Sequence, residues 1–196
     1  MKKIMMIAAM MVAVLSANAQ NEVGQVTLKP MVGLNLASLT KADDSKIRVG
    51  LAAGVEAEYG VAENFGITAG LIYSMQGVKG KDEISGVKVD ETIKLDYINI
   101  PILANYYVTK GLAIKAGIQP AFKVNAKLKA EAGGVTAEEK IDNAKGFDFS
   151  IPVGISYEYE SFVLDARYNF GLTKWMDGLD SKNSVFMISL GYKFSL

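Results

Sequence analysis

Eight segments of this chain alternate apolar with polar side chains over ten or more residues, and this pattern constrains the fold most strongly. Successive side chains of a β-strand point to opposite faces, so the alternation predicts strands with one apolar and one polar face. After residue 24, no apolar run is long enough for a membrane-spanning helix. The predicted strands lie near residues 25–37, 47–60, 65–78, 92–107, 112–127, 147–159, 162–173 and 184–195.

The connections between these segments alternate in length. Short turns are expected at 61–64, 108–110 and 160–161, and long charged loops at 38–46, 79–91, 129–145 and 174–183. Short turns at one end and long loops at the other are typical of up-and-down barrels in outer membranes. The pattern predicts an all-β fold, an eight-stranded antiparallel up-and-down transmembrane β-barrel, with the short turns and both termini on the periplasmic side.

Alternation alone leaves two kinds of barrel open, because a secreted lipocalin-like barrel has its apolar face inside. Three observations favour an apolar face that points out into lipid. The interior of an eight-stranded barrel is only just filled by side chains, and the apolar face carries too many large residues to fit there. Ten strand glycines fall on the polar face. Of 18 aromatic residues, 15 fall on the apolar face, many near strand ends where interfacial girdles lie, and the exceptions are Tyr97, Tyr107 and Trp175.

The first residues have the composition of an export signal. Met1-Lys2-Lys3 is basic, Ile4 to Leu15 is apolar, and Ser16-Ala17-Asn18-Ala19 supplies the small residues that signal peptidase recognises. The apolar run of about 12 residues is shorter than the roughly 20 that a spanning helix needs. We expect residues 1–19 to be a cleaved signal peptide, and residues 20–196 to be one β-barrel domain in the cell outer membrane.

The composition excludes several kinds of chemistry. The chain has no Cys and no His, and its 21 basic residues balance 21 acidic residues. Disulfides, thiolate or imidazole catalysis and Cys/His metal sites are therefore ruled out, and the basic excess typical of nucleic-acid binding is absent. Asp43-Asp44, and Asp177 with Asp180, lack a full calcium-loop pattern. We expect no enzyme activity, cofactor, metal or nucleic-acid partner.

Charged residues gather on the inward face of the predicted strands, near their periplasmic ends. Isolated charges in a narrow lumen are costly, so these four acids and four bases are expected to pair. The favoured interpretation is a polar network that closes the lumen; the alternative is a narrow gated path for small solutes. The network residues are Lys29, Glu56, Glu58, Lys115, Glu158, Asp165, Arg167 and Lys193. In the outer half, the pattern indicates a modest cationic vestibule of Arg48, Lys123 and Lys127 against Asp148.

Several sequence strings resemble the PorT-like outer-membrane β-barrel domain family. The run Tyr97-Ile98-Asn99-Ile100-Pro101-Ile102-Leu103, followed by Asn105-Tyr106-Tyr107, is similar to the family's "IPLL…KYY" strand. The "xARYxxGL" strand is matched by Asp165-Ala166-Arg167-Tyr168-Asn169-Phe170-Gly171-Leu172. Two further matches are Phe147-Asp148-Phe149 before Gly154-Ile155-Ser156-Tyr157, and the closing Gly191-Tyr192-Lys193-Phe194. The sequence departs from the family at Ser150, where glycine is usual, and at Ser195-Leu196, which extend past the usual terminal aromatic residue. The resemblance covers essentially the whole mature chain and implies an outer-membrane barrel, although most members have no assigned activity.

Together these features predict a non-enzymatic barrel with a structural or interaction role through its long extracellular loops. A narrow gated pore for small solutes is the first alternative, and a secreted soluble ligand-binding barrel is the second. The expected partners are outer-membrane lipid, the barrel-assembly machinery during insertion, and an unidentified partner at the extracellular loops. The protein is expected to be a monomer.

Overall fold

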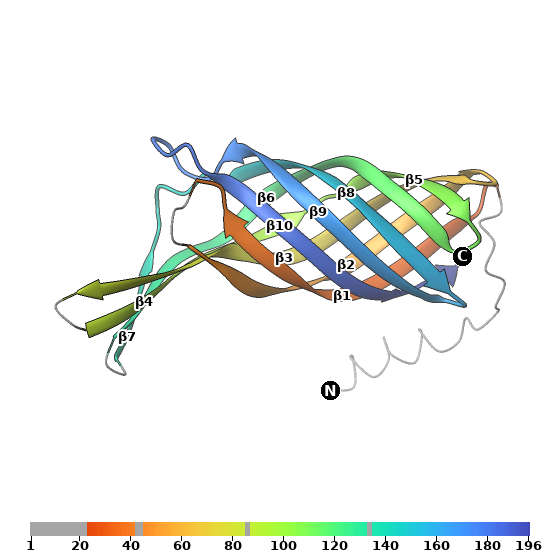
Figure 1. Ribbon diagram of the computed structural model, residues 1–196. Coiled ribbons are helices and arrows are strands. Elements are labelled where there is room, and N and C mark those ends of the chain that lie inside the picture. Colours follow the sequence, from red (N-terminus) through yellow and green to blue (C-terminus); the bar gives the residue numbers. More distant parts are fainter. Residues whose placement is uncertain (1–22, 42–44, 85–86, 133–134) are drawn as a thin grey trace, which may run out of the picture.

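The computed structural model describes residues 23–41, 45–84, 87–132 and 135–196, so the predicted signal peptide lies outside the described residues. Strands make up nearly all of this part of the chain (Figure 1). In chain order they are β1 (Val26–Leu39), β2 (Lys46–Ala62), β3 (Phe65–Ile84), β4 (Val87–Asn99), β5 (Ile102–Thr109), β6 (Leu112–Ala132), β7 (Val135–Lys140), β8 (Phe147–Tyr159), β9 (Phe162–Lys174), β10 (Lys182–Tyr192) and β11 (Phe194–Ser195).

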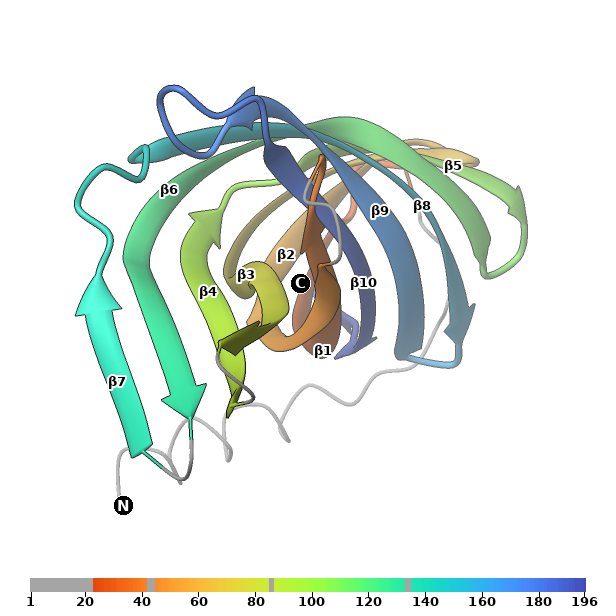
Figure 2. The same cartoon turned by 60° about the vertical axis from the view of Figure 1, so that its left-hand side comes forward.

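These strands form one antiparallel sheet that closes on itself. Neighbours pair in the order β1, β2, β3, β4, β6, β8, β9 and β10, and β10 pairs back with β1 from Asn183–Gly191 to Met31–Leu39. β5 continues the position of β4 between β3 and β6, and β11 continues that of β10 beside β1. The described residues therefore form the predicted ring of eight strand positions (Figure 1, Figure 2).

The alternation of the sequence becomes the two faces of this ring. On β6, Ile114 and Ile118 are exposed on the outer wall, whereas Lys115 and Gln119 are buried inside. The same division holds on β9, where Leu164 is exposed and Arg167 is buried. An outer wall with this much exposed apolar surface fits contact with lipid. The alternative of a soluble barrel is wrong, because it requires the apolar face inside.

The two ends of the ring differ, and we call them the turn end and the loop end. At the turn end, two-residue connections join β2 to β3, β5 to β6 and β8 to β9. Gly111 and Glu160 have φ values of +87° and +56° in two of these turns, the left-handed backbone that tight connections require. The C-terminus also lies at the turn end (Figure 1).

At the loop end, two of the predicted loops are largely strands. β3 and β4 stay paired out to Ile84 and Val87, and β7 pairs with the far end of β6. The expectation of long loops at 79–91 and 129–145 is therefore wrong for most of the described residues, which lie in paired strands. Beyond the apolar wall the strands no longer contact lipid, so neither of their faces has to be hydrophobic. The sequence there alternates less regularly between apolar and polar residues, although the strands remain hydrogen-bonded to each other. These strands project past the rim on one side of the ring (Figure 1, Figure 2).

Two irregularities in the strands affect where side chains point. The predicted strand 92–107 divides at Ile100 and Pro101, because proline has no amide hydrogen to give to the ladder. On β6 the register against β4 shifts by one residue, since Tyr97 pairs with Lys123 but Asp96 pairs with Asn125. Such a bulge exchanges the inward and outward positions for the rest of the strand.

Candidate functional site: the barrel lumen

Five charged side chains from β1, β2, β6 and β9 form one network inside the turn-end half of the ring. Nη1 of Arg167 donates to Oε1 of Glu56 at 2.8 Å, and Nε and Nη2 donate to the two carboxylate oxygens of Asp165 at 2.8 and 2.9 Å. Nζ of Lys29 lies 2.7 Å from Oε2 of Glu56. Nζ of Lys115 donates to Oδ2 of Asp165 at 2.8 Å. We call Lys29, Glu56, Lys115, Asp165 and Arg167 the central cluster.

Glycines on the inner face give these long side chains their space. Gly154 on β8 pairs directly with Arg167 on β9, and a Cβ atom at Gly154 would lie only 2.6 Å from Cβ of Arg167. A Cβ at Gly70 would likewise lie 2.8 Å from Cγ of Glu56. The position of glycine on the polar face therefore follows from crowding inside a narrow ring.

The central cluster is almost inaccessible to water. Glu56, Asp165 and Arg167 are each only 1% exposed. Burial of charge at this depth is tolerated only when pairing and hydrogen bonds compensate for lost hydration. The planar guanidinium of Arg167 suits this arrangement, because its fork contacts two carboxylates at once. The cluster therefore holds its charges in mutual contact.

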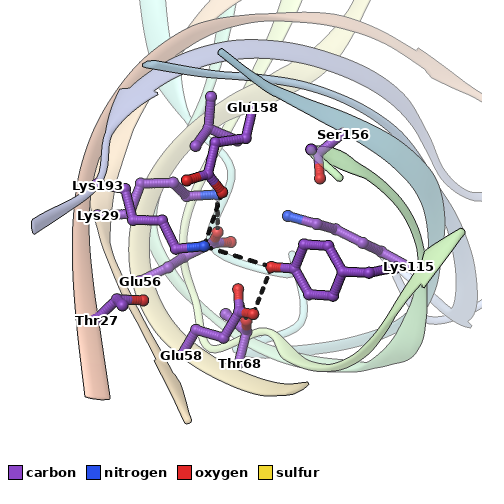
Figure 3. A pocket seen from close by; sticks show the side chains of 12 residues that line it. Thr27, Lys29, Glu56, Glu58, Thr68, Lys115, Ser156, Glu158 and Lys193 are labelled. Carbon is purple, nitrogen blue, oxygen red and sulfur yellow. Dashed lines mark hydrogen bonds and ion pairs between the residues drawn. The ribbon is translucent and has the colours of Figure 1, made fainter. Parts of the chain in front are cut away.

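The three other predicted network residues lie nearer the turn end, around a small pocket. Nζ of Lys193 donates to Oε2 of Glu158 at 2.8 Å. Oη of Tyr107 donates to Oε1 of Glu58 at 2.5 Å, and Nζ of Lys193 approaches Oη of Tyr107 at 3.5 Å. We call Glu58, Tyr107, Glu158 and Lys193 the mouth cluster. The pocket that they border has a volume of about 10 Å³, room for about one water molecule (Figure 3).

Directly above the central cluster, toward the loop end, lies an uncharged layer of the lumen. Met31, Ala52, Ile72 and Met187 form a buried apolar layer. A further set of polar side chains is joined by hydrogen bonds: Nδ2 of Asn35 and Nε2 of Gln76 donate to Oγ of Ser74 at 2.9 and 3.1 Å, and Nε2 of Gln119 donates to Oγ of Ser150 at 3.1 Å.

A buried apolar group closes the lumen at the loop end. Trp175, in the connection from β9 to β10, is 5% exposed and packs with side chains from the ring. The backbone of its loop is held by hydrogen bonds from the amide of Lys145 to the carbonyl of Trp175 at 2.8 Å and from the amide of Trp175 to the carbonyl of Ser181 at 3.2 Å. We call this group the apolar cap; it consists of Leu39, Val78, Leu95, Tyr97, Ala121, Ala126, Ala144 and Trp175.

The expected cationic vestibule is not formed, and that prediction is wrong. Arg48 lies 3.6 Å from Asp96, while Lys123 donates to the carbonyl of Ala144. Asp148 accepts a hydrogen bond from Thr173. Lys127 pairs with Glu138 at 3.4 Å on the outer face, because the β6 bulge turns it out of the lumen. The space assigned to a vestibule is occupied by the apolar cap.

The structure therefore brings the eight predicted network residues into two adjoining clusters, five central and three at the mouth. Sequence reasoning missed Tyr107 and the whole apolar cap. A signal for both was present, since Tyr97, Tyr107 and Trp175 were the aromatic residues that did not fall on the apolar face. Two of these three aromatic residues belong to the cap, and the third belongs to the mouth cluster.

Neither a helical span nor a metal centre is found in the described part of the chain. Within residues 23–41, 45–84, 87–132 and 135–196, no helix is long and apolar enough to cross a membrane. In the same ranges, no three acidic side chains gather in a way that could hold a metal ion.

Comparison with solved structures supports the fold. Neisserial surface protein A, from Neisseria, superposes with a TM-score of 0.52 at 14% identity, covering 91% of this chain and 99% of that chain. Ail, the attachment invasion locus protein of Yersinia pestis, gives a TM-score of 0.48 at 17% identity, covering 88% and 100%. OprG of Pseudomonas aeruginosa gives 0.42 at 8% identity, covering 91% and 98%. At these identities the likeness concerns the fold alone, and it rests on the Neisserial protein, whose TM-score exceeds 0.5.

The family is shown by a second comparison. No curated protein matches the sequence. The family model described as "Outer membrane protein beta-barrel domain" matches residues 18–177, which is most of the chain. With an apolar outer wall and a closed eight-position ring, this match also assigns the protein to the outer membrane. The chain belongs to the outer membrane protein beta-barrel domain family.

Proposed function

We propose that this protein is a closed, non-enzymatic barrel that acts as a structural and interaction protein through the strands projecting from its loop end. The observation that carries the proposal is the filling of the lumen. The central cluster blocks one half and the apolar cap blocks the other. An eight-stranded barrel has an interior just wide enough for side chains, so a resting channel for solutes has no space.

The projecting strands provide the surface for a partner. β7 is exposed at every residue from Val135 to Lys140, and β6 is the neighbour with which it pairs. Solvent-facing segments on a rigid scaffold are where binding residues concentrate. We place the loop end outside the cell and the turn end, with both termini, in the periplasm, since short periplasmic turns and longer outer loops are usual in this architecture. The barrel is inserted as a monomer by the barrel-assembly machinery.

Conductance of the purified mature protein in planar lipid bilayers tests the closed lumen. The parent protein should show no discrete conductance steps. A control variant in which Lys145, a half-exposed loop residue paired with Asp177, is changed to Ala should show none either. Regular conductance steps in the parent would contradict the proposal.

Cysteine labelling tests the orientation, and the chain suits it because it contains no Cys. Lys140→Cys at the end of β7 should react with a membrane-impermeant maleimide on intact cells. Asn64→Cys, in the exposed turn between β2 and β3, should react only after the outer membrane is permeabilised. Labelling of position 64 but not of position 140 on intact cells would invert the orientation.

A narrow gated path is the second candidate, and one observation favours it. The seal at the loop end depends on Trp175, which belongs to a connecting loop and whose buried indole nitrogen makes no hydrogen bond within the described residues. A seal on a loop is easier to displace than one on a strand. Under this candidate, brief openings in the parent should become more frequent in Trp175→Ala.

A further inference from the structure

Lysines are aligned across the strands that project from the loop end. In the register of β4, β6 and β7, Lys94 lies directly opposite Lys127, and Lys127 lies directly opposite Lys140. Two residues further along, Lys79 of β3 is opposite Thr92, and Thr92 is opposite Lys129. Directly paired residues share one face of a sheet, so all five lysines lie on the same face. We call Lys79, Lys94, Lys127, Lys129 and Lys140 the lysine face.

The lysine face is turned to the outside of the barrel. Residues at the intervening positions, Ile93, Leu95 and Ala126, pack in or against the apolar cap inside the lumen. Ion pairs show that the lysines share the opposite side, since Oε1 and Oε2 of Glu138 lie 2.5 and 3.4 Å from Nζ of Lys94 and Lys127. The β6 bulge produces this orientation, because without it Lys127 and Lys129 would point inward. Bulges that re-aim side chains are common where a strand carries function.

Along the barrel axis, the lysine face lies just beyond the loop-end edge of the apolar outer wall, where the membrane surface is expected. On the outer wall of β6, Phe122 and Val124 are 49% and 55% exposed, and they are the last apolar outward residues before Lys127. Phe122 also stacks edge-on with Phe147 at 5.6 Å between ring centroids, a pairing typical of the aromatic girdle at the interface. Three residues span roughly 10 Å along a strand, which a tilt of about 40° reduces to roughly 8 Å along the membrane normal. Lys127 therefore lies about one lipid headgroup beyond the edge of the apolar wall.

The aligned positive charges of the lysine face favour an anionic partner. Like charges directly opposite in a sheet are unfavourable, and here three lysines follow one another across neighbouring strands. Glu138 bridges two of them, and Glu131 pairs with Lys129 at 2.8 Å. With Asp90 and Asp96 included, four acids share this face with the five lysines, and Asp96 already lies 3.6 Å from Arg48. Lys79 and Lys140 are exposed and have no ion-pair partner among the described residues.

We propose that the lysine face binds the phosphate groups of lipid headgroups in the outer leaflet. Neighbouring strands lie about 4.8 Å apart, so a phosphate above the row can contact ammonium groups from two strands. The lysine stems lie over the upper edge of the apolar wall while their charged ends reach the headgroups. The choice of the outer leaflet rests on the orientation proposed above; the choice of lipid phosphate rests on the lysine face itself.

Binding of bis-phosphorylated lipid A to the full mature protein in a zwitterionic detergent tests the proposal. Changing Lys94, Lys127 and Lys140 together to Gln should weaken binding by roughly tenfold or more, given the usual contribution of each cation near an anionic surface. Glu138→Gln should tighten binding several-fold, because it removes the competing carboxylate. Both effects should shrink at high salt.

The matched control changes three exposed or half-exposed lysines at the loop end but off the lysine face, Lys41, Lys145 and Lys174, to Gln, which lowers net charge equally. If this control weakens binding as much as the test variant, the lysine face is not the site. Dephosphorylated lipid A should bind no better to the parent than to the test variant. If inorganic phosphate competes at the same concentration as lipid A, the site is a free-anion site and the proposal fails. Because this assay is independent of orientation, its failure is distinct from that of the labelling experiment on position 140.

Discussion

At the scale of single residues, Arg167 is the side chain on which the closed lumen most depends. Its guanidinium donates hydrogen bonds of 2.8 to 2.9 Å to both carboxylates, Glu56 and Asp165, whereas Lys29 lies 2.7 Å from Glu56 but 3.9 Å from Asp165. Without it, Glu56 keeps Lys29 and Asp165 keeps Lys115, and the two pairs are joined only by the 3.9 Å contact of Lys29 with Asp165. The network would then hold two buried carboxylates with fewer donors.

Arg167→Ala should therefore destabilise the barrel strongly. Removal of one member of a buried ion pair usually costs about 3–5 kcal/mol, whereas removal of the half-exposed Lys145 side chain should cost less than about 1 kcal/mol. Urea unfolding in detergent micelles, followed by tryptophan fluorescence and gel mobility, measures the difference. Equal stability of the Arg167→Ala and Lys145→Ala variants would mean that the network contributes nothing to the fold.

The inward position of these residues was predictable from the sequence, but their partners were not. Alternation is a local property, so it assigns Arg167 and Glu56 to the inward face of their own strands. It does not show that these two residues, 111 positions apart in the chain, contact each other. Which inward residues meet depends on strand tilt and register, and these are set by pairing around the whole ring. Lys127 was misassigned for a related reason: a one-residue bulge on β6 reverses its face and leaves no clear mark in the sequence.

At the scale of elements, the connection from β9 to β10 closes the loop end of the lumen with Trp175. A long charged segment was expected here, and its charges do lie outside, with Asp180 paired to Lys174 at 3.4 Å. Hydrogen bonds from Lys41 and Lys174 lower the pKa of Asp180 below its usual value. Trp175, at the start of the same segment, instead turns inward and is buried in the apolar cap. One indole in a connecting segment gives no periodic signal, so the sequence marks Trp175 as an aromatic residue off the apolar face but does not say where it packs.

Trp175→Ala should loosen the loop end without dismantling the ring. Truncation of a large buried aromatic side chain usually costs about 3–5 kcal/mol, while Trp175→Phe should retain most of the stability because it refills most of the space. Limited proteolysis of intact cells and micelle-bound protein should show faster cleavage between residues 175 and 181 in the Ala variant. If cleavage there is unchanged, the cap does not anchor this loop.

At the scale of the whole molecule, the fold explains how the chain can be both apolar outside and polar inside. The ring satisfies its backbone hydrogen bonds internally and has no free edge among its eight positions. The sequence predicted this architecture well, because alternation, turn lengths and glycine placement all pointed to the same answer. The projecting hairpins were less predictable, since they lie where the lipid no longer imposes a hydrophobic face.

The mature protein should fractionate with outer membranes and migrate differently on gels before and after boiling. A closed barrel of hydrogen-bonded strands stays folded in mild detergent and unfolds only on heating, which changes its apparent size. The N-terminal residue of the purified protein should be Gln20 if the leader is removed as predicted. Recovery as a soluble periplasmic protein that needs no detergent would contradict the membrane assignment.

The pairing of the first strand with the last has a consequence for how the chain can be rearranged. The amide of Leu196 donates to the carbonyl of Val26 at 3.0 Å, so the two ends of the domain lie side by side at the turn end. Chains with adjacent ends tolerate circular permutation. A permutant that begins at Phe65 and ends at Asn64, with its old ends joined by a short Gly-Ser linker and a new signal peptide in front, should form the same ring and keep its heat-dependent gel shift. Its last strand would then be β2 and not β10 or β11, so its assembly in cells would reveal whether insertion requires the present C-terminal sequence or only the closure of a ring.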